Sequence, residues 1–109
     1  MSNDLQQFKA DFFKALAHPL RIRILEVLAE GEISVNDIQQ ILSSEGSTVS
    51  QQLSVLRGKN IVVGRKDGKK VLYSLRDPAI IELLKVARDL FNNHLIDTIS
   101  MYEELEGQK

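Results

Sequence analysis

The stretch that most constrains the fold runs from Ser47 to Arg57 and reads STVSQQLSVLR. Its apolar residues Val49, Leu53 and Leu56 recur at helical spacing, which predicts one buried helix face. The hydroxyl of Ser47 is expected to cap this helix, because it can accept a hydrogen bond from an unpaired amide of the first turn. The stretch therefore predicts a short helix with one apolar side.

The other face of this helix is polar but uncharged, whereas a solvated helix face usually carries Lys and Glu. It holds Thr48, Ser50, Gln51, Gln52 and Ser54. Such side chains can bond to base edges in a DNA major groove, where Gln can pair bidentately with adenine. Two interpretations are open from this stretch alone, an ordinary polar surface helix and a DNA-reading helix. Val55 lies near the same face, where it would contact a thymine methyl or pack under neighbouring chain.

A helix from Ser34 to Ser43 is expected immediately before this one. Ser34 can cap it, with Ile38, Ile41 and Leu42 facing inward. A short turn then leads into the Ser47 helix. Two helices joined in this way are typical of a helix-turn-helix, whose second helix can enter the major groove.

A basic hairpin is expected after Lys59-Asn60, which closes the Ser47 helix. Two β-rich runs, Ile61–Arg65 and Val71–Leu75, flank Asp67-Gly68, a strong hairpin signal. Although the whole chain has a net charge of −1, residues 57–70 carry +5 and the rest carries −6. A basic segment on an acidic body is typical of an anion-binding surface. The hairpin is therefore expected to be a wing that reaches phosphates or the minor groove through Arg65, Lys66, Lys69 and Lys70.

A helix upstream of these elements is expected to begin at Pro19, with His18 at or near its cap, and to end at Gly31. Its core face would be formed by Leu20, Ile24, Val27 and Leu28. Arg21 and Arg23 fall outside this face and are expected to point to solvent or phosphate.

Two further helices carry more apolar surface than one small domain needs. The first spans Asp4–Leu16, and the other begins at Asp77-Pro78 and keeps an apolar stripe from Ile80 to Tyr102. A subunit interface would use this surface, although plain core is an equal interpretation for the first helix. The interface candidates are Leu5, Phe8, Phe12, Leu83, Ala87, Leu90, Phe91, His94 and Leu95.

The order helix, helix, helix-turn-helix, hairpin, long helix resembles the ArsR/SmtB family of winged-helix transcriptional repressors. The likeness covers about Phe8 to Phe91 and is carried by FKALAHPLRIRILEVLAEGEISVNDI, STVSQQLSVLRGKNIV and GKKVLYSL. It implies a homodimer, joined through the first and last helices, that binds operator DNA overlapping a promoter and leaves it when an effector binds. Bases would be read by Thr48, Ser50, Gln51 and Gln52, with phosphate contacts from Ser47 and Arg57.

The metal sites of that family are not matched. Its third-helix site uses two cysteines in a segment like ELCVCDL, whereas this chain reads EISVNDI, with Ser34 and Asn36 at the cysteine positions. Its last-helix zinc site needs four ligands, of which only Asp77 is present; the other three positions hold Ala79, Leu90 and Asn93. One ligand of four cannot hold zinc. His94 and Asp97 lie three apart, which leaves open a site shared across a dimer or a plain polar pair.

Several function classes are excluded by what the sequence lacks. Without cysteine there is no disulfide, thiolate metal site or thiol sensor. No Ser-His-Asp set, carboxylate pair or phosphate-binding loop is present, so neither an enzyme nor a cofactor is expected. No signal peptide or membrane-length apolar run is present either, so a cytoplasmic protein without a membrane partner is expected.

The sequence thus predicts a mainly α protein with a β-hairpin wing (α+β). A single winged helix-turn-helix domain spans 1–109, with the helix-turn-helix at 34–58, the wing at 61–75 and a long dimerisation helix at 77–105. The predicted function is a homodimeric repressor on double-stranded operator DNA, regulated by neither metal nor thiol and with an unknown effector. The alternative is a winged-helix dimer that acts mainly as a protein-interaction module with weak DNA binding, which the net charge of −1 favours.

Overall fold

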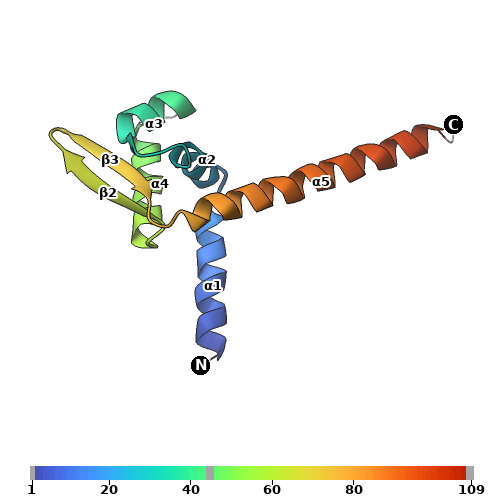
Figure 1. Cartoon of the computed structure of the whole chain (residues 1–109), viewed down its shortest axis with the longest axis horizontal. Coiled ribbons are helices and arrows are strands. Elements are labelled where there is room, and N and C mark those ends of the chain that lie inside the picture. Colours follow the sequence, from blue (N-terminus) through green and yellow to red (C-terminus); the bar gives the residue numbers. More distant parts are fainter. Residues whose placement is uncertain (1, 44–45, 108–109) are drawn as a thin grey trace. The chain divides into compact units, whose positions relative to one another are not determined.

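The structure is a computed structural model that describes residues 2–43 and 46–107; the side chains of residues 2, 3, 46 and 47 are outside the description. The chain divides into two compact units, Met1–Pro78 and Ala79–Lys109. In order, the elements are α1 (Ser2–Leu16), α2 (Pro19–Leu28), β1 (Ile33–Ser34), α3 (Val35–Leu42), α4 (Gly46–Gly58), β2 (Val62–Asp67), β3 (Lys70–Leu75) and α5 (Ala79–Gly107) (Figure 1). The winged helix-turn-helix fold class predicted from the sequence is confirmed.

The start of α2 follows the prediction. Pro19 is its first residue, and Nδ1 of His18 accepts a hydrogen bond from the amide of Leu20 at 3.2 Å. This bond satisfies one of the amides that a helix start leaves without an intrahelical partner. The dipeptide His18-Pro19 therefore starts the helix: the histidine ring nitrogen caps it, and the proline is its first residue.

Helix α3 is capped as expected but buries a narrower face. The hydroxyl of Ser34 accepts from the amide of Asp37 at 3.2 Å, and Ser43 ends the helix in the left-handed region at φ 52°. Ile38 and Leu42 are buried, whereas Ile41 is 57% exposed, so the inward orientation expected of Ile41 is wrong. At 3.6 residues per turn Ile41 lies about 100° from Leu42, which takes it off the face that Ile38 and Leu42 share.

The buried stripe of α4 is confirmed, because Val49, Leu53 and Leu56 are each 0% exposed. The helix begins at Gly46, so Ser47 lies inside the first turn rather than before it. Its end is closed by Asn60, which adopts φ 60° while the amide of Ile61 donates to the carbonyl of Leu56 at 3.0 Å. This is the bonding pattern of a Schellman cap, and it agrees with the expected stop at Lys59-Asn60.

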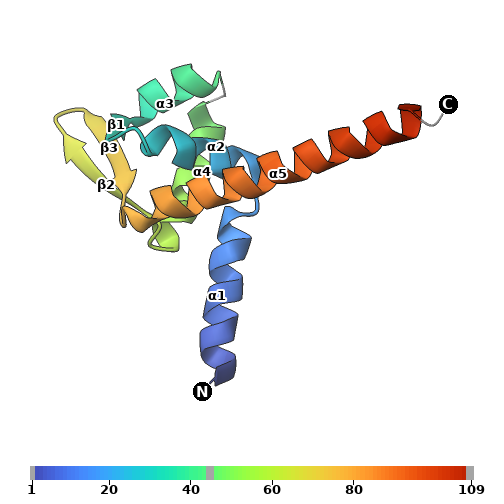
Figure 2. The same ribbon diagram turned by 45° about the vertical axis from the view of Figure 1, so that its right-hand side comes forward.

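The sheet has three antiparallel strands in the order β1-β3-β2, rather than the two strands expected (Figure 2). The two-residue β1 was missed, because a segment so short carries no alternation. The hairpin turn is Gly68-Lys69, one residue later than expected, because Asp67 pairs with Lys70. Gly68 adopts φ +64°, which suits the first position of a type II′ turn, where glycine is favoured.

Strands β2 and β3 make a close contact in which a tyrosine ring lies against a glycine. Gly64 pairs with Tyr73, and a Cβ at Gly64 would lie 3.0 Å from Cε1 of the Tyr73 ring. Glycine therefore leaves room for the ring, which is itself buried. The core that supports the sheet and helices comprises Ile24, Leu25, Leu28, Ile38, Val49, Leu53, Leu56, Ile61 and Val62.

The second unit is the single helix α5, which starts two residues after Asp77, within the usual scatter of helix boundaries. Ile80 is buried, but from Lys85 to Gly107 every side chain is exposed except the half-buried Thr98. Within the described residues no helix is both long and apolar enough to cross a membrane.

Candidate nucleic-acid interface

The polar face of α4 is largely presented to solvent. Ser50, Gln51 and Ser54 are exposed, whereas Thr48 and Val55 are half-buried. Because the opposite face of the helix is fully buried, the helix cannot roll without disrupting the core. The exposed face is therefore a fixed array of hydroxyl and amide groups, the type of surface that can bond to base edges.

Gln52 differs from its neighbours on this helix. It is half-buried, and its Oε1 accepts a hydrogen bond from Nε of Arg21 at 2.8 Å. Arg21 is half-buried as well, and its Nη1 donates to the carbonyl of Ala15 at 3.2 Å. The expectation that Arg21 points to solvent or phosphate is thus wrong, because its donors bond to α4 and α1. Arg23 is exposed, and its Nη2 donates to the carbonyl of Leu42 at 3.4 Å.

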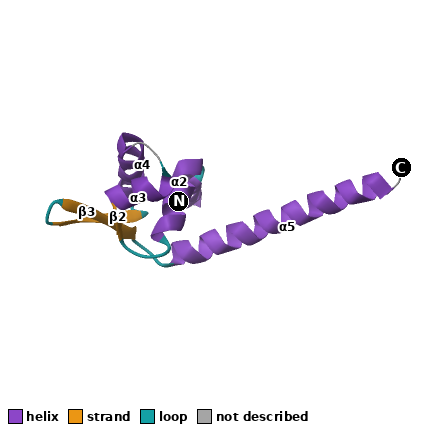
Figure 3. Ribbon diagram, turned by 90° about the horizontal axis from the view of Figure 1, so that it is seen from above, coloured by secondary structure: helices purple, strands orange, loops and turns teal. Residues whose placement is uncertain are grey.

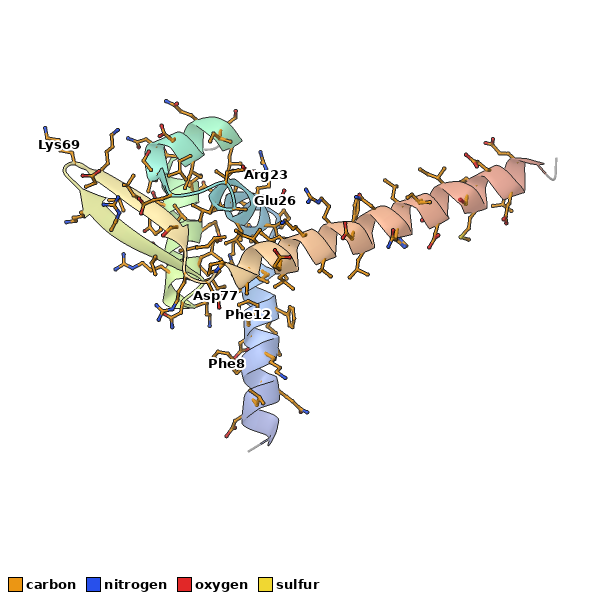
Figure 4. The ribbon with its side chains drawn as sticks, in the orientation of Figure 1. Phe8, Phe12, Arg23, Glu26, Lys69 and Asp77 are labelled. Atoms are coloured by element: carbon orange, nitrogen blue, oxygen red, sulfur yellow. The ribbon has the colours of Figure 1, made fainter. Side chains whose placement is uncertain are left out.

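The wing carries its cations at its solvent-exposed end. The hairpin lies beside the helices of its unit (Figure 3), with Lys69 at its tip (Figure 4). The four basic residues of the wing are all exposed, as is Arg57 in the last turn of α4; the four are Arg65, Lys66, Lys69 and Lys70. Exposed cations of this kind can neutralise backbone phosphates.

Arg65 forms an ion pair with Glu32, a residue that the sequence did not indicate as part of the site. Its Nε and Nη2 donate to the two carboxylate oxygens of Glu32 at 2.9 and 2.7 Å, a bidentate pair. These hydrogen bonds hold the pKa of Glu32 below its ordinary value and raise the pKa of Arg65. Glu32 lies just before β1, and β3 lies between β1 and β2 in the sheet. Without β1, no sequence pattern places Glu32 near the wing.

The apolar stripes of α1 and α5 are exposed in the chain described. On α1, Leu5 and Phe8 are 57% and 71% exposed, so they do not belong to the core of their unit. Phe12, which is labelled with Phe8 in Figure 4, is half-buried. Its ring packs edge-to-face on that of Phe13. On α5, Leu83 is half-buried, while the other candidates for an interface are exposed, namely Ala87, Leu90, Phe91, His94 and Leu95. Exposed apolar side chains that follow one another along a helix are typical of interaction surfaces.

His94 and Asp97 are both exposed on α5. The backbone carbonyl of His94 accepts a hydrogen bond from the hydroxyl of Thr98 at 2.9 Å. In the part of the chain that the structure describes, no three residues of His, Cys, Asp or Glu come together as a metal site.

A helix-turn-helix with a fixed polar face, followed by a basic hairpin wing within a three-stranded sheet, defines the class of winged-helix DNA-binding proteins. Residues 18–63 match the family model described as bacterial regulatory protein, arsR family. The chain is 46% identical to the HTH-type transcriptional regulator Rv0081 of Mycobacterium tuberculosis over 97% of this chain and 94% of that protein. It is 39% identical to a transcriptional repressor SmtB homolog of Synechocystis, over 82% of this chain and 67% of that protein.

Solved structures agree with this assignment. The crystal structure of Rv0081 superposes with a TM-score of 0.80 at 47% identity, covering 87% of this chain and 96% of that one. The homodimeric winged helix-turn-helix DNA-binding domain of Mb0332 from Mycobacterium bovis gives a TM-score of 0.78 at 28% identity, covering 86% and 87%. The chain belongs to the ArsR/SmtB family and is a DNA-binding transcriptional regulator, not an enzyme.

Proposed function

We propose that this regulator is a homodimeric repressor that recognises its operator through the exposed, uncharged face of α4. That face is the observation that carries the proposal, since a buried stripe of 0% exposure holds it in place. Thr48, Ser50 and Gln51 read base edges, Gln52 contributes through its amide, and Ser47 and Arg57 contact phosphate. The wing adds phosphate contacts through Lys66, Lys69 and Lys70, and through Arg65 when it is released from Glu32.

Dimerisation supplies the second half-site. The exposed apolar residues of α1 and α5 support an interface through these helices, as does the homodimeric state of the Mb0332 domain. A two-fold dimer places two recognition helices on successive turns of one DNA face. Sedimentation should therefore show a dimer at micromolar concentration, and Leu90→Glu should dissociate it by placing a charge in an apolar contact. A stable folded monomer of the unaltered chain would overturn this part of the proposal.

Repression, rather than activation, is supported by the Synechocystis relative, which is a transcriptional repressor. The regulator would act in the cytoplasm, where its operator lies. Its release would not depend on metal or thiol chemistry, because the chain has no cysteine and Ala79, Leu90 and Asn93 replace three zinc ligands. His94 with Asp97 is the residual metal candidate.

Selection from a pool of random DNA duplexes tests the proposed function. The unaltered chain should enrich one two-fold-related sequence, and a reporter driven by a promoter containing that sequence should be repressed. Absence of any enriched sequence would refute DNA reading and favour a protein-interaction module. Titrating the complex with stoichiometric zinc, nickel or cadmium after chelation should leave its affinity unchanged. A tenfold loss that disappears in His94→Ala would place a metal sensor on α5.

A further inference from the structure

Arg21 joins three helices through one side chain. Arg21 lies on α2. Its Nε donates to the amide oxygen of Gln52 on α4 at 2.8 Å, and its Nη1 donates to the carbonyl of Ala15 on α1 at 3.2 Å. Arginine has donors only, so the atom of Gln52 that faces it must be the oxygen and not the nitrogen. The orientation of the Gln52 amide is thereby determined by its partner.

The contact with α1 holds the guanidinium in place. The last carbonyls of a helix lack intrahelical partners, and two of those in α1 are satisfied locally. The carbonyl of Lys14 accepts from the amide of Ala17 at 3.1 Å, and the carbonyl of Leu16 accepts from the amide of His18 at 2.9 Å. The carbonyl of Ala15 accepts from Arg21, where a cation also suits the negative end of the helix dipole. The guanidinium thus has a second hydrogen bond, to α1, besides its bond to Gln52 on α4.

The hydrogen bond from Arg21 to Oε1 of Gln52 changes which groups of the Gln52 amide remain free to bond to DNA. A free glutamine matches adenine, because adenine presents an acceptor at N7 and a donor at N6. With Oε1 already accepting from Arg21, the amide Nε2 is the group left to bond to a base, and it can only donate. Guanine presents two acceptors, N7 and O6, and suits such a donor better than adenine does.

We propose that Arg21 is a positioning residue that sets the base preference of the recognition helix, by holding the Gln52 amide in a donor-outward orientation that favours guanine over adenine. Gln52 is half-buried and lies one turn after Thr48 and next to the exposed Gln51, which puts this residue at the flank of the reading face. This inference rests on the proposed function, since it assumes that α4 reads base edges.

The test is selection from random duplexes with the full chain, Arg21→Met, Gln52→Met and the double variant. Met keeps much of the apolar stem of Arg and the length of Gln while removing the polar groups. Gln52→Met should erase the preference for guanine at one position of each half-site, which identifies the base pair concerned. Arg21→Met should shift that position toward adenine by about fivefold or more and leave the other positions unchanged. In the Gln52→Met background, Arg21→Met should change nothing at that position, which is the signature of coupled residues.

Two further variants keep the inference falsifiable if Arg21→Met does not fold. Arg21→Lys keeps a cationic donor but on a single nitrogen, and it should keep part of the guanine preference. Gln52→Glu retains the acceptor for Arg21 but has no donor, so it should fold and lose the guanine preference. Equal loss of affinity for all sequences in Arg21→Met, or an unchanged profile in Gln52→Met, would overturn the inference alone. An unaltered chain that enriches no sequence would overturn the proposed function and this inference together.

Discussion

Helix α4 buries one face completely, whereas the wing is only partly buried: β3 has one buried and four half-buried residues, and β2 is exposed after its first residue. Val49, Leu53 and Leu56 are 0% exposed, but in β2 only Val62 is buried and the next five residues are exposed. The two regions also carry different functional groups: α4 presents hydroxyls and amides, whereas the wing presents cations. Base reading depends on hydrogen-bond geometry and needs a fixed support, while attraction to phosphates tolerates movement.

The two regions also differ in how their polar side chains are held. Arg21 on α2 donates a hydrogen bond to the amide oxygen of Gln52 on α4, and both residues are half-buried. On the wing, Glu32 binds Arg65 where both side chains are solvent-accessible, at 35% and 58% exposure. Exposed ion pairs contribute little because water and salt screen them. We therefore expect changes to α4 to alter the choice of sequence, and changes to the wing to alter affinity for all DNA.

The largest expected effect is on the support of α4. Leu53→Ala should lower the free energy of unfolding by roughly 2–5 kcal/mol, because it leaves a cavity in a fully buried site. Val63→Ala, on the partly exposed wing strand, should cost less than about 1 kcal/mol. Urea unfolding of both variants measures the difference. Equal losses would contradict the contrast between a rigid helix support and a lightly packed wing.

The next effect concerns charge on the wing. Lys66→Gln with Lys69→Gln should reduce the slope of log affinity against log salt by roughly two units if each lysine contacts a phosphate. Specific and non-specific duplexes should be affected alike, as measured by fluorescence anisotropy across salt concentrations. Lys9→Gln with Lys14→Gln on α1 makes the same charge change outside the proposed DNA interface and at positions that are not in the apolar stripe of α1, so it should leave the slope nearly unaltered. A lysine pair on the wing that behaves like this control would mean that the hairpin points away from DNA.

A smaller and more selective effect is expected from the reading face. Gln51→Ala should weaken the selected sequence by roughly 1–3 kcal/mol while changing random DNA much less. Gln6→Ala removes an exposed glutamine from α1 and serves as the matched control. Competition binding against both duplexes provides the measurement, and equal losses on the two would refute a base-reading role for Gln51.

The smallest effect concerns the pair between Glu32 and Arg65. The pKa of Glu32 is lowered in the folded chain, mainly by hydrogen bonds from Arg65. The stabilisation it provides is therefore present above the unfolded pKa of the carboxyl and is lost as the pH falls through the folded pKa. Glu32→Gln should slightly lower the Tm at neutral pH, and the difference should vanish in acid.

DNA binding offers a second measurement of the same pair. Because Glu32→Gln frees Arg65 from a competing carboxylate, affinity for all DNA should rise, with a steeper dependence on salt. Glu30→Gln removes a nearby exposed charge outside the pair and is the matched control. A variant at Glu32 that matches this control in both melting and DNA binding would show that the pair has no role in solution.

Local signals made much of the fold predictable from the sequence. The stripe of α4 follows from spacing, and the caps at His18, Ser34 and Asn60 follow from residues that satisfy helix ends within a few positions. The expected orientation of Ile41 was wrong, because apolar spacing does not define how wide a buried face is.

The long-range side-chain contacts at the candidate interface were not predictable in this way. Arg21 and Gln52 are 31 residues apart in sequence, and Glu32 and Arg65 are 33 apart. Such pairs meet only once the helices and the three-stranded sheet are assembled. The sequence therefore indicated which residues lie on the polar face of α4 and on the wing, but not which of them are already engaged within the protein.

The central claim is that this chain binds DNA by sequence, and one measurement tests it most directly. Affinity of the unaltered chain for its selected duplex and for a scrambled duplex of equal length should be measured across a series of salt concentrations. If the chain binds DNA by sequence, both affinities fall linearly on logarithmic axes and the selected duplex binds at least about 10³-fold more tightly at physiological salt. Equal affinity for the two duplexes at every salt concentration would contradict it.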